Sequence, residues 1–302
     1  MGKKILITGG TGLIGTRLSE ILIDLGYDVA HLSRKPAKGS HYKAFRWDVE
    51  QGTIDENAIL YADYILHLAG ANLGREKWTE ERKKVILNSR VESSLLLYEK
   101  LKKLPHHVKG FISASAIGIY GDSGDRLVTE ESIYGDDFLA DVTKRWESAA
   151  YKVHSLGIRT VLFRNGLVLS DQGGALPQMA KPVKMMAGAP LGSGKQYMSW
   201  IHIDDLCRLY VEAIENTSFQ GVYNAVAPNP VTNEEFTKAL AKAMGKPLVL
   251  PKVPAFGLKL MLGELSEILL TGQRVSANKV LHTGFTFEYV TLDKALGAFY
   301  NE

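Results

Sequence analysis

The segment KILITGGTGLIG, residues 4–15, joins a short apolar run to a turn that carries Gly9, Gly12 and Gly15. Apolar residues then recur at helical spacing, and Gly26 follows as a residue suited to a left-handed helix end. A second apolar run occupies residues 28–32. The pattern predicts a strand, a tight turn, a helix that ends before Gly26, and a second strand.

The same alternation of short apolar runs and helix-period stretches continues beyond this unit. Further strands are predicted at residues 43–47, 64–68, 110–113 and 160–163, and helices at 79–104, 138–156 and 203–216. Strands that alternate with helices form parallel sheets with helices on both faces. The predicted fold is therefore α/β, a Rossmann-type doubly wound parallel sheet with a small C-terminal α+β subdomain.

The domain organisation follows from where this alternation changes. Residues 1–165 are predicted to form the nucleotide-binding domain, and residues 200–225 return to it with a strand at 222–225. Residues 166–199 are rich in glycine and proline and are expected to form long loops above the sheet. Together with residues 226–302, which begin with a helix near Asn233, they make up the substrate side and the subdomain. Residues 253–270 contain Lys259, Glu264 and Glu267 and are predicted to form one amphipathic helix, not a membrane span.

The composition indicates an ordinary soluble globular protein. Of 302 residues, 45% are hydrophobic and 23% charged, and the net charge of +3 comes from charges spread along the chain. No concentrated basic field is present, so nucleic acid is not expected as a partner. The single cysteine, Cys207, is predicted to be a buried, inert thiol. Because Gly9 and Gly10 break the first apolar run, no cleavable signal is recognised and the cytoplasm is the expected location. We predict no metal site and no membrane partner.

The glycine turn predicts a dinucleotide site because it directly follows a strand and directly precedes a helix. One glycine permits the tight turn, one allows a diphosphate to approach the backbone, and one allows close packing of helix and strand. The start of the helix also directs unpaired N–H groups at the anion. The residues expected to contact the cofactor here are Gly9, Thr11, Gly12, Leu13, Ile14 and Gly15.

The residues after the second strand favour NADP(H) over NAD(H). NAD sites usually place an acidic residue about 20 residues past the glycines, where it holds the ribose hydroxyls. This chain instead has Ser33, Arg34 and Lys35, which offer a hydroxyl and two cations to a 2′-phosphate. A solvated basic loop is the alternative. Asp48, after the third predicted strand, is a candidate to hydrogen-bond the adenine ring, and an ordinary exposed loop aspartate is the alternative for it.

Four longer motifs point to a protein family as well as to a fold. They are TGGTGLIG at 8–15, HLAGA at 67–71, SASAIGIYG at 113–121 and WIHIDDL at 200–206. They resemble the extended and atypical short-chain dehydrogenase/reductase superfamily. The further stretches RNGLVLS, GGALP and VPAFGLKLMLGELSEILLTGQRV resemble, more narrowly, the NAD-dependent epimerase/dehydratase-like epimerase family with a C-terminal domain of unknown function. The resemblance covers almost the whole chain.

The resemblance implies further contacts with NADP(H). Leu68, Ala69 and Gly70 are expected to line the cofactor, because bulky side chains there would collide with its ribose or diphosphate. Arg90 resembles a cofactor-contacting arginine of the narrower family, and an exposed helix cation is the alternative. Leu167 is expected to offer a backbone contact close to the nicotinamide.

The resemblance also implies a catalytic serine, tyrosine and lysine, in which the lysine lowers the tyrosine pKa. Ser115 is placed to be the serine, and Lys144 matches the lysine loosely. The tyrosine position holds Ala140, which has no proton to exchange. Tyr120 is the candidate replacement, although a tyrosine at this point is also commonly packed as part of the structure. Lys144 is equally well explained as a surface cation.

Two functions follow from this pattern. The first is an NADP(H)-dependent oxidoreductase or epimerase that acts on a small carbonyl or nucleotide-sugar-like substrate. Its pocket is expected among residues 173–174, 198–200 and Arg274, above the carboxyl ends of the strands. The second, favoured by Ala140, is an NADP(H)-binding sensor or scaffold with little turnover. Whether the chain forms a homodimer stays open.

Overall fold

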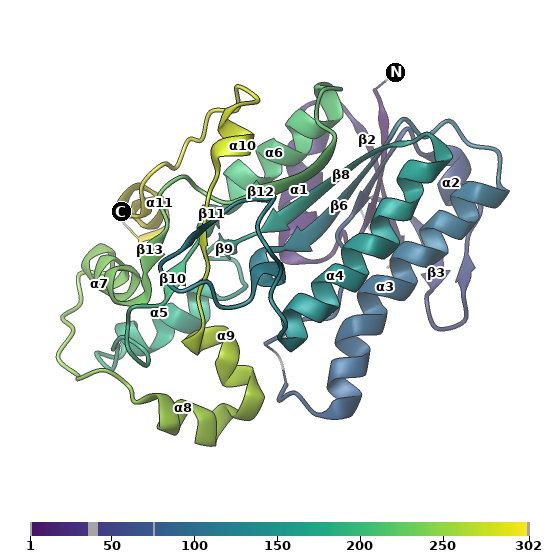
Figure 1. Ribbon diagram of the computed structural model, residues 1–302. Coiled ribbons are helices and arrows are strands. Elements are labelled where there is room, and N and C mark those ends of the chain that lie inside the picture. The colour runs from purple at the N-terminus through teal and green to yellow at the C-terminus, as the bar shows by residue number, and fades with distance from the viewer. Residues whose placement is uncertain (1, 36–41, 75, 301–302) are drawn as a thin grey trace.

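A parallel sheet forms the centre of the molecule (Figure 1). The computed structural model describes residues 2–35, 42–74 and 76–300. Within these residues, eight strands form one sheet in the order β12-β8-β6-β5-β1-β2-β3-β4. They span Lys4–Thr8 (β1), Asp28–Ser33 (β2), Lys43–Asp48 (β3), Thr53–Ile54 (β4), Tyr64–His67 (β5), Gly110–Ala116 (β6), Arg159–Asn165 (β8) and Gly221–Ala225 (β12). All neighbouring pairs are parallel except β3 and β4.

The strand order confirms the predicted doubly wound α/β fold. From β1 the chain builds the sheet in one direction through β2 and β3, and later in the other direction through β5, β6, β8 and β12. The order reverses between β1 and β5. In such sheets ligands bind at the reversal, beyond the carboxyl ends of the strands. The loops after Thr8 and His67 therefore lie at the point where a ligand site is expected.

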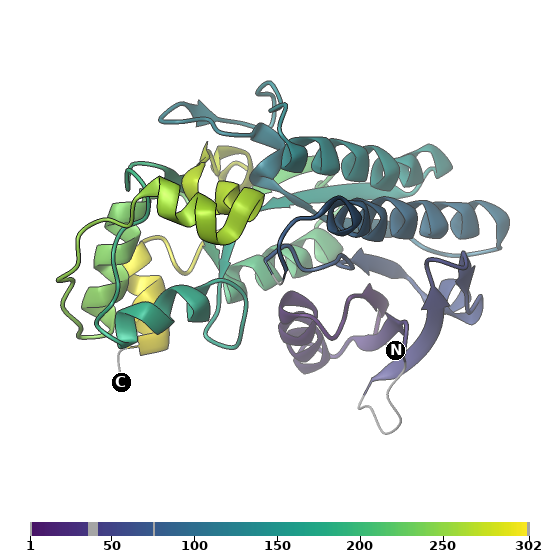
Figure 2. The same ribbon diagram turned by 90° about the horizontal axis from the view of Figure 1, so that it is seen from below.

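Helices cover both faces of the sheet (Figure 2). Leu18 and Leu22 of α1 (Leu13–Asp24) and Leu206 of α6 (Ile203–Glu215) pack with Ile5 and Ile7 in one core cluster. On the other face, α2 (Asn57–Tyr61), α3 (Glu80–Lys103) and α4 (Phe138–Tyr151) pack against alternate residues of the same strands. Because side chains alternate across a strand, one apolar run supplies both cores.

Capping residues set the helix ends near the predicted limits. Thr79 accepts a hydrogen bond from the N–H of Arg82 and begins α3, which matches the helix predicted at 79–104. Helix α1 ends at Asp24, and Gly26 follows with φ of 83°. The predicted helix at 138–156 is α4 followed by a 3-10 turn, η2 (Lys152–Leu156).

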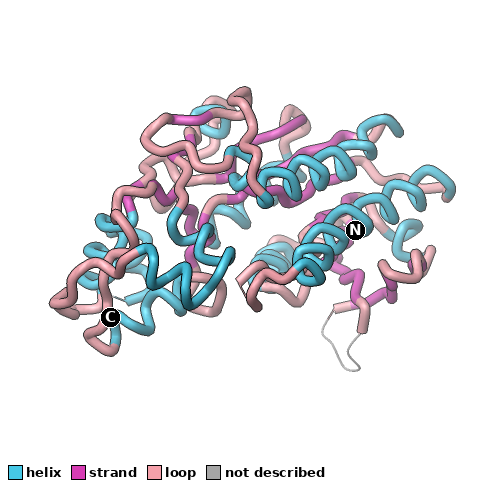
Figure 3. The backbone as a smooth tube through the Cα atoms, turned by 60° about the horizontal axis from the view of Figure 1, so that its bottom comes forward, coloured by secondary structure: helices cyan, strands magenta, loops and turns pink. Residues whose placement is uncertain are grey.

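The C-terminal part gathers short strands and helices beside the sheet (Figure 3). Its helices are α5 (Leu176–Lys184), α7 (Asn233–Ala243), α8 (Ala255–Leu262), α9 (Glu267–Leu270), α10 (Asn278–Leu281) and α11 (Leu292–Tyr300). Its short strand pairs are β7 (Leu127–Val128) with β14 (Arg274–Val275), β9 (Leu167–Leu169) with β11 (Trp200–His202), and β10 (Tyr197–Met198) with β13 (Val231–Thr232).

Two sequence predictions for this part are wrong. Residues 166–199 are not only long loops, because they contain α5; Pro177 occupies the first turn of this helix, where its missing N–H costs nothing. Residues 253–270 do not form one amphipathic helix. Gly263 adopts φ of 61° and ends α8, after which the 3-10 turn η3 (Gly263–Ser266) leads into α9. This glycine conformation interrupts an otherwise apolar stretch.

Candidate functional site

The three glycines of the turn after β1 have different surroundings. Gly9 adopts φ of 70°, and a Cβ there would lie 2.9 Å from the carbonyl carbon of Leu68. A Cβ on Gly15 would lie 2.3 Å from the carbonyl oxygen of Gly9, so the close approach of α1 to the turn needs glycine. A Cβ on Gly12 would meet only this same oxygen, at 3.2 Å, among the described atoms within 4 Å. Gly9 and Gly15 therefore serve the fold, while Gly12 leaves the backbone open to an approaching group.

The first turn of α1 presents unpaired N–H groups. Thr16 N–H bonds to the carbonyl oxygen of Gly12 at 2.8 Å and is the first to join the helical ladder. No described side chain caps this end, and no acidic residue lies in the first turn. The N–H groups of Leu13, Ile14 and Gly15 precede the ladder and face outward with the positive end of the helix dipole. This arrangement fits the diphosphate of a dinucleotide.

A buried hydrogen-bond network joins the glycine turn to the loop after β5. Thr8 Oγ1 accepts the N–H groups of Leu68 and Ala69, both at 3.1 Å, and lies 2.8 Å from His67 Nδ1. Because Thr8 already accepts two protons, it donates its own to Nδ1, and His67 carries its proton on Nε2, 3.1 Å from Ser94 Oγ. Burial lowers the pKa of His67 to about 3. His67 belongs to the HLAGA motif, but sequence reasoning assigned it no role.

Arg90 is a half-buried cation beside this loop. A Cβ on Gly70 would lie 3.1 Å from its guanidinium carbon, so the small residue makes room for the arginine. Arg90 donates to the carbonyl oxygens of Ala71 and Ile86, both at 3.0 Å, and lies 5.3 Å from the centre of the Trp146 ring. No described carboxylate pairs with it, and burial lowers its pKa to about 10. An anion at the edge of Gly70 would supply the missing counter-charge.

The residues predicted to select the cofactor lie at the ends of β2 and β3. Ser33 ends β2 beside Arg46 of β3, and Arg34 follows as an exposed residue with no described carboxylate partner. Asp48 ends β3, and its Oδ1 accepts the N–H groups of Glu50 and Gln51 at 3.1 Å. One oxygen of Asp48 is thus used by the turn. Arg34 stays available to an anion.

A buried ionic network lies behind the end of β6. Ser115 Oγ donates to Glu147 Oε1 at 2.5 Å, and Arg164 donates to both oxygens of Glu147 at 2.8 Å. The side chain of Arg164 is 1% exposed and that of Glu147 is 10% exposed. Sequence reasoning named Ser115 but missed Glu147 and Arg164. An acidic residue on the inner face of α4 and an arginine at the end of the apolar run TVLFRN were the available signals.

Tyr120 belongs to the same network. Its hydroxyl accepts from Arg164 at 2.8 Å and donates to Asn224 Oδ1 at 2.7 Å, and its side chain is buried. Burial raises the pKa of Tyr120 to about 12. A phenol with this pKa remains protonated at neutral pH and exchanges its proton poorly. These contacts are those of a residue that supports the structure.

Lys144 and Ala140 share α4, but the predicted lysine does not join this network. Lys144 Nζ donates to the carbonyl oxygen of Gly135 at 3.2 Å, and Ala140 is fully buried. The N–H of Ala140 donates to Oδ1 of Asp137 at 2.8 Å, and Asp137 thereby caps the helix. The structure therefore brings Ser115 and Tyr120 together through Arg164 and Glu147, and leaves Lys144 outside that cluster.

Of the loops predicted to form one substrate pocket, residues 198–200 lie beside Arg274. Ser199 Oγ accepts the N–H of Val275 at 2.9 Å, and Arg274 lies 5.1 Å from the centre of the Tyr197 ring. A Cβ on Gly174 would lie 3.0 Å from Leu13 Cδ2, so the loop of Gly174 lies against the first residue of α1. Trp200 is fully buried, and its indole donates to the carbonyl oxygen of Asn229. Arg274 donates to the carbonyl oxygen of Asp125. Leu167, expected near the nicotinamide, uses its N–H to bond Ser199 at 2.8 Å.

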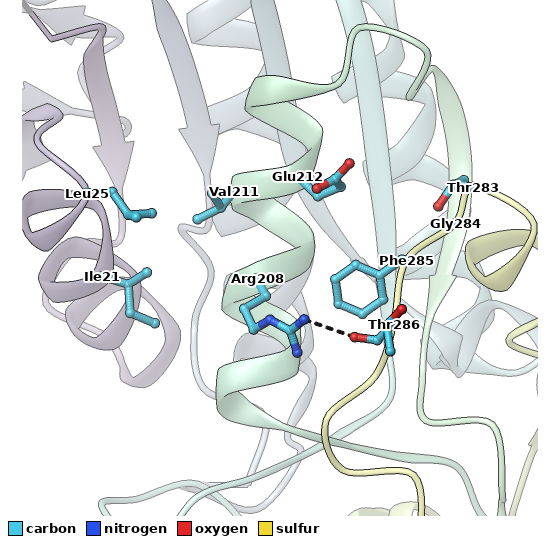
Figure 4. Close-up of a pocket in the computed structure, with 9 residues that line it drawn as sticks. All are labelled: Ile21, Leu25, Arg208, Val211, Glu212, Thr283, Gly284, Phe285 and Thr286. Carbon is cyan, nitrogen blue, oxygen red and sulfur yellow. Dashed lines mark hydrogen bonds between the residues drawn. The ribbon is translucent and has the colours of Figure 1, made fainter.

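Two cavities lie among the described residues, and Tyr120 and Gln273 line the first of them. One of about 750 Å³ is bounded by the loop of Tyr134 and Gly135 on one side and by Lys259 and Leu270 on the other. A second of about 500 Å³ lies between α1 and α6, where Arg208 donates to the carbonyl oxygen of Thr286 at 3.0 Å (Figure 4). It contacts the last turns of α1, at the opposite end from the glycine turn. The first cavity is the better candidate for a substrate, because residues of the loop after β6 line it.

Comparison with family models divides the chain into two matched segments. Residues 5–225 match the NAD dependent epimerase/dehydratase family, and residues 253–299 match a domain of unknown function, DUF1731. The epimerase family protein YfhF of Bacillus subtilis is 38% identical over 297 residues, which covers 97% of this chain and 96% of that protein.

Two solved structures resemble this one over nearly its whole length. The human epimerase family protein SDR39U1, solved with NADPH, has a TM-score of 0.88 and 32% identity, with 99% of each chain covered. A nucleoside-diphosphate sugar epimerase from Corynebacterium glutamicum has a TM-score of 0.80 and 35% identity, with 98% of this chain and 57% of that one covered.

Proposed function

Because the chain belongs to the NAD dependent epimerase/dehydratase family, we propose that it is an NADP(H)-dependent oxidoreductase or epimerase of the short-chain dehydrogenase type. The proposed substrate is a small carbonyl compound or a nucleotide-sugar-like molecule. The name of the Corynebacterium relative supports the second class. The proposed location is the cytoplasm.

The observation that carries this proposal is the open backbone at Gly12, in front of an uncapped helix end. The nearest described atom to a Cβ on Gly12 belongs to the turn itself, so space remains for a ligand. We propose that the diphosphate of the cofactor binds there, against the N–H groups of the residues at 11–15. Leu68, Ala69 and Gly70 would line the neighbouring ribose, and Arg90 would balance the negative charge.

The preference for the phosphorylated cofactor rests on Arg34 and Ser33. An exposed guanidinium that no carboxylate of the described residues pairs with, next to a hydroxyl at the end of β2, suits a 2′-phosphate. The NADPH in the human relative supports this choice. Asp48 is proposed to meet the adenine with its second oxygen, and Leu167 to lie near the nicotinamide.

The bound cofactor would supply hydride exchange at its nicotinamide ring. The chain's own residues would then have to handle the substrate proton. Ser115, Tyr120 and Lys144 remain the residues proposed for this work. Two contacts count against them: the proton of Ser115 is directed at Glu147, and the pKa of Tyr120 is raised to about 12 by burial.

These two contacts, together with Ala140, support a second proposal. The chain would then bind NADP(H) as a sensor or scaffold, with little turnover. The two proposals share the cofactor site and differ only in the chemistry beside it.

One set of measurements separates these alternatives. NADPH and NADH binding are measured by calorimetry, and the protein is then incubated with aldehydes, ketones and nucleotide sugars. Loss of the reduced-nicotinamide absorbance reports redox turnover, and chromatography of the sugars reports epimerisation without net redox change. Turnover of any substrate supports the enzyme, whereas tight NADPH binding without turnover supports the sensor. If neither NADPH nor NADH binds, both proposals are contradicted.

A further inference from the structure

Arg164 contacts two tyrosines, which differ in where their hydroxyl protons go. Nη1 of Arg164 donates to Tyr120 at 2.8 Å, and Nη2 donates to Tyr134 at 3.1 Å. Tyr120 is buried and passes its own proton to Asn224 at 2.7 Å. Tyr134 is 44% exposed, and none of the described groups accepts its proton. Tyr134 therefore keeps a free hydroxyl proton on a residue that is open to solvent.

Tyr134 also lines the cavity of about 750 Å³ that is the candidate substrate site. The loop after β6 contributes Gly118 and Gly121 to the lining of this cavity, and the C-terminal part contributes Leu270. In an open α/β sheet, substrates bind beyond the carboxyl ends of the strands. The free hydroxyl of Tyr134 is thus placed on a residue that a substrate in this cavity would contact.

The loop that carries Tyr134 is fixed on both sides of that residue. Arg164 donates to the carbonyl oxygen of Glu130 at 3.2 Å, and Lys144 donates to the carbonyl oxygen of Gly135 at 3.2 Å. These bonds hold the backbone before and after the tyrosine. The hydroxyl of Tyr134 is therefore not needed to keep the loop in place.

The guanidinium of Arg164 supports proton transfer by the phenol. Two of its N–H groups bond to Glu147, and the other three bond to Tyr120, Tyr134 and the carbonyl oxygen of Glu130. All five donors are in use, so the plane of the guanidinium is fixed. A fixed donor aimed at an oxygen stabilises the negative charge that develops there when a proton leaves.

We propose that Tyr134 is the catalytic acid and base of this protein, with Arg164 as the positioning residue that holds the phenol oxygen. In the reduction of a carbonyl group, the O–H bond of Tyr134 breaks and its proton bonds to the substrate oxygen. The electron pair of the broken bond stays on the phenolate, and solvent later returns a proton to it. The substrate carbon takes hydride from reduced nicotinamide, the co-reactant of the proposed function. The inference rests on that function and assigns its proton transfer to one residue.

The alternative is a tyrosine that only packs against Arg164. The guanidinium carbon of Arg164 lies 5.1 Å from the centre of the Tyr134 ring, so such packing is present. A phenylalanine at this position keeps the ring and removes only the hydroxyl. The variant Tyr134→Phe therefore separates proton transfer from packing.

Kinetics of Tyr134→Phe test the proposal with the full chain. NADPH is supplied with a panel of aldehydes, ketones and nucleotide sugars that includes benzaldehyde, butanedione and UDP-glucose. The variant is expected to lower kcat at least about 100-fold and to change KM less than about threefold, because proton transfer matters only in the transition state. Its NADPH affinity and its urea unfolding midpoint should equal those of the wild type. The control Tyr151→Phe, which changes another exposed tyrosine, should keep wild-type turnover.

A chemical measurement tests the free hydroxyl without cofactor or substrate. N-acetylimidazole acetylates accessible tyrosine hydroxyls, and peptide mass mapping identifies the modified residues. Tyr134 should be acetylated in the folded protein, whereas the buried Tyr120 should not.

Each outcome of these experiments decides the proposal. An unchanged kcat in Tyr134→Phe overturns the inference and leaves the proposed function in place. A Tyr134 that resists acetylation also overturns it. A Tyr134→Phe protein that loses NADPH binding or stability together with turnover overturns it as well, since the hydroxyl would then serve the cofactor site or the fold. If the wild type binds NADPH and turns over no member of the panel, both the inference and the enzymatic function are contradicted, and the sensor is supported.

Discussion

Ser115 donates its hydroxyl proton to Glu147 Oε1 at 2.5 Å, and the same oxygen accepts from Arg164 Nε at 2.8 Å. A serine committed in this way cannot also donate to a substrate oxygen while Glu147 is ionised. Glu147 is in turn the only described carboxylate that pairs with Arg164. The three side chains therefore behave as one unit that joins β6, α4 and β8.

Replacing Glu147 by Gln is expected to destabilise the protein strongly. Arg164 is 1% exposed and would lose its counter-ion inside the core. Removing one partner of a buried pair costs about 3–5 kcal/mol in the free energy of unfolding. Urea unfolding measures this change. Asp141→Asn is the control, since it breaks the exposed pair with Arg145 on the same helix and should cost less than about 1 kcal/mol. A similar loss of unfolding free energy in both variants would contradict the larger contribution expected of the buried pair.

Alanine at Gly12 is expected to weaken cofactor binding, whereas alanine at Gly15 is expected to lower the stability of the fold. The Gly12→Ala protein is expected to fold with a stability within about 1 kcal/mol of the wild type, because Gly12 has an extended backbone and open space around it. Its NADPH affinity should fall at least about tenfold, since the new methyl group occupies the proposed diphosphate position. Gly15→Ala should lose about 1–3 kcal/mol of stability, because its Cβ would lie 2.3 Å from the Gly9 oxygen. Calorimetry with NADPH and thermal unfolding report the two effects, and unchanged NADPH affinity in Gly12→Ala would contradict the diphosphate position.

Arg34→Ala is expected to remove the preference for NADPH. Losing a charged hydrogen bond to the 2′-phosphate should weaken NADPH binding by about 1.5–3 kcal/mol and leave NADH binding unchanged. Thermal stabilisation by each cofactor at matched concentrations provides the measurement. Lys242→Ala, which removes an exposed cation on α7, serves as the control. If NADH stabilises the unmodified protein as well as NADPH does, the assignment of Ser33 and Arg34 to a 2′-phosphate is wrong.

The stability of the fold should decrease in mild acid because of His67. Burial lowers its pKa in the folded protein to about 3, below the ordinary value of 6.5, so the unfolded chain takes up the proton first as the pH falls. Stability is therefore complete above about pH 6.5 and decreases down to about pH 3, with a loss of about 1.4 kcal/mol from this group at about pH 5.5. The difference between the urea unfolding midpoints at about pH 5.5 and 7.5 measures this loss of stability. His31 and His202 also have lowered pKa values, so His67→Asn should reduce the slope without abolishing it. An unchanged slope in that variant would show that His67 is not the titrating group.

Local sequence signals predicted the sheet and the first helix closely. The run Lys4–Thr8 is β1 without change, and Asp28–Ser33 extends its predicted strand by one residue. Cys207 is buried as expected, and burial raises its pKa. These features follow from short-range patterns, in which apolar periodicity and a glycine cap act on neighbouring residues. The glycines of the turn were predictable for the same reason.

Long-range contacts explain what the sequence did not reveal. Glu147 meets Arg164 and Ser115 only when α4, β8 and β6 come together, and no short motif contains all three residues. Residues 198–200 and Arg274 belong to different strand pairs and still lie side by side, because Ser199 bonds to Gln273 and Val275. The helix α5 was obscured by Pro182 within it, and the break at Gly263 depends on a backbone conformation that composition does not specify.

The pairing of β14 with β7 ties the end of the chain to its first half. Val275, Val280 and Phe287 belong to the same core cluster as Ile5 and Ile7, and Asp205 accepts the N–H groups of Glu288 and Tyr289. The boundary between the two matched sequence segments is therefore not a boundary between two separate hydrophobic cores. A gene truncated after residue 252 would encode a protein with an open core, and neither segment can be exchanged for that of a distant relative without repacking the other.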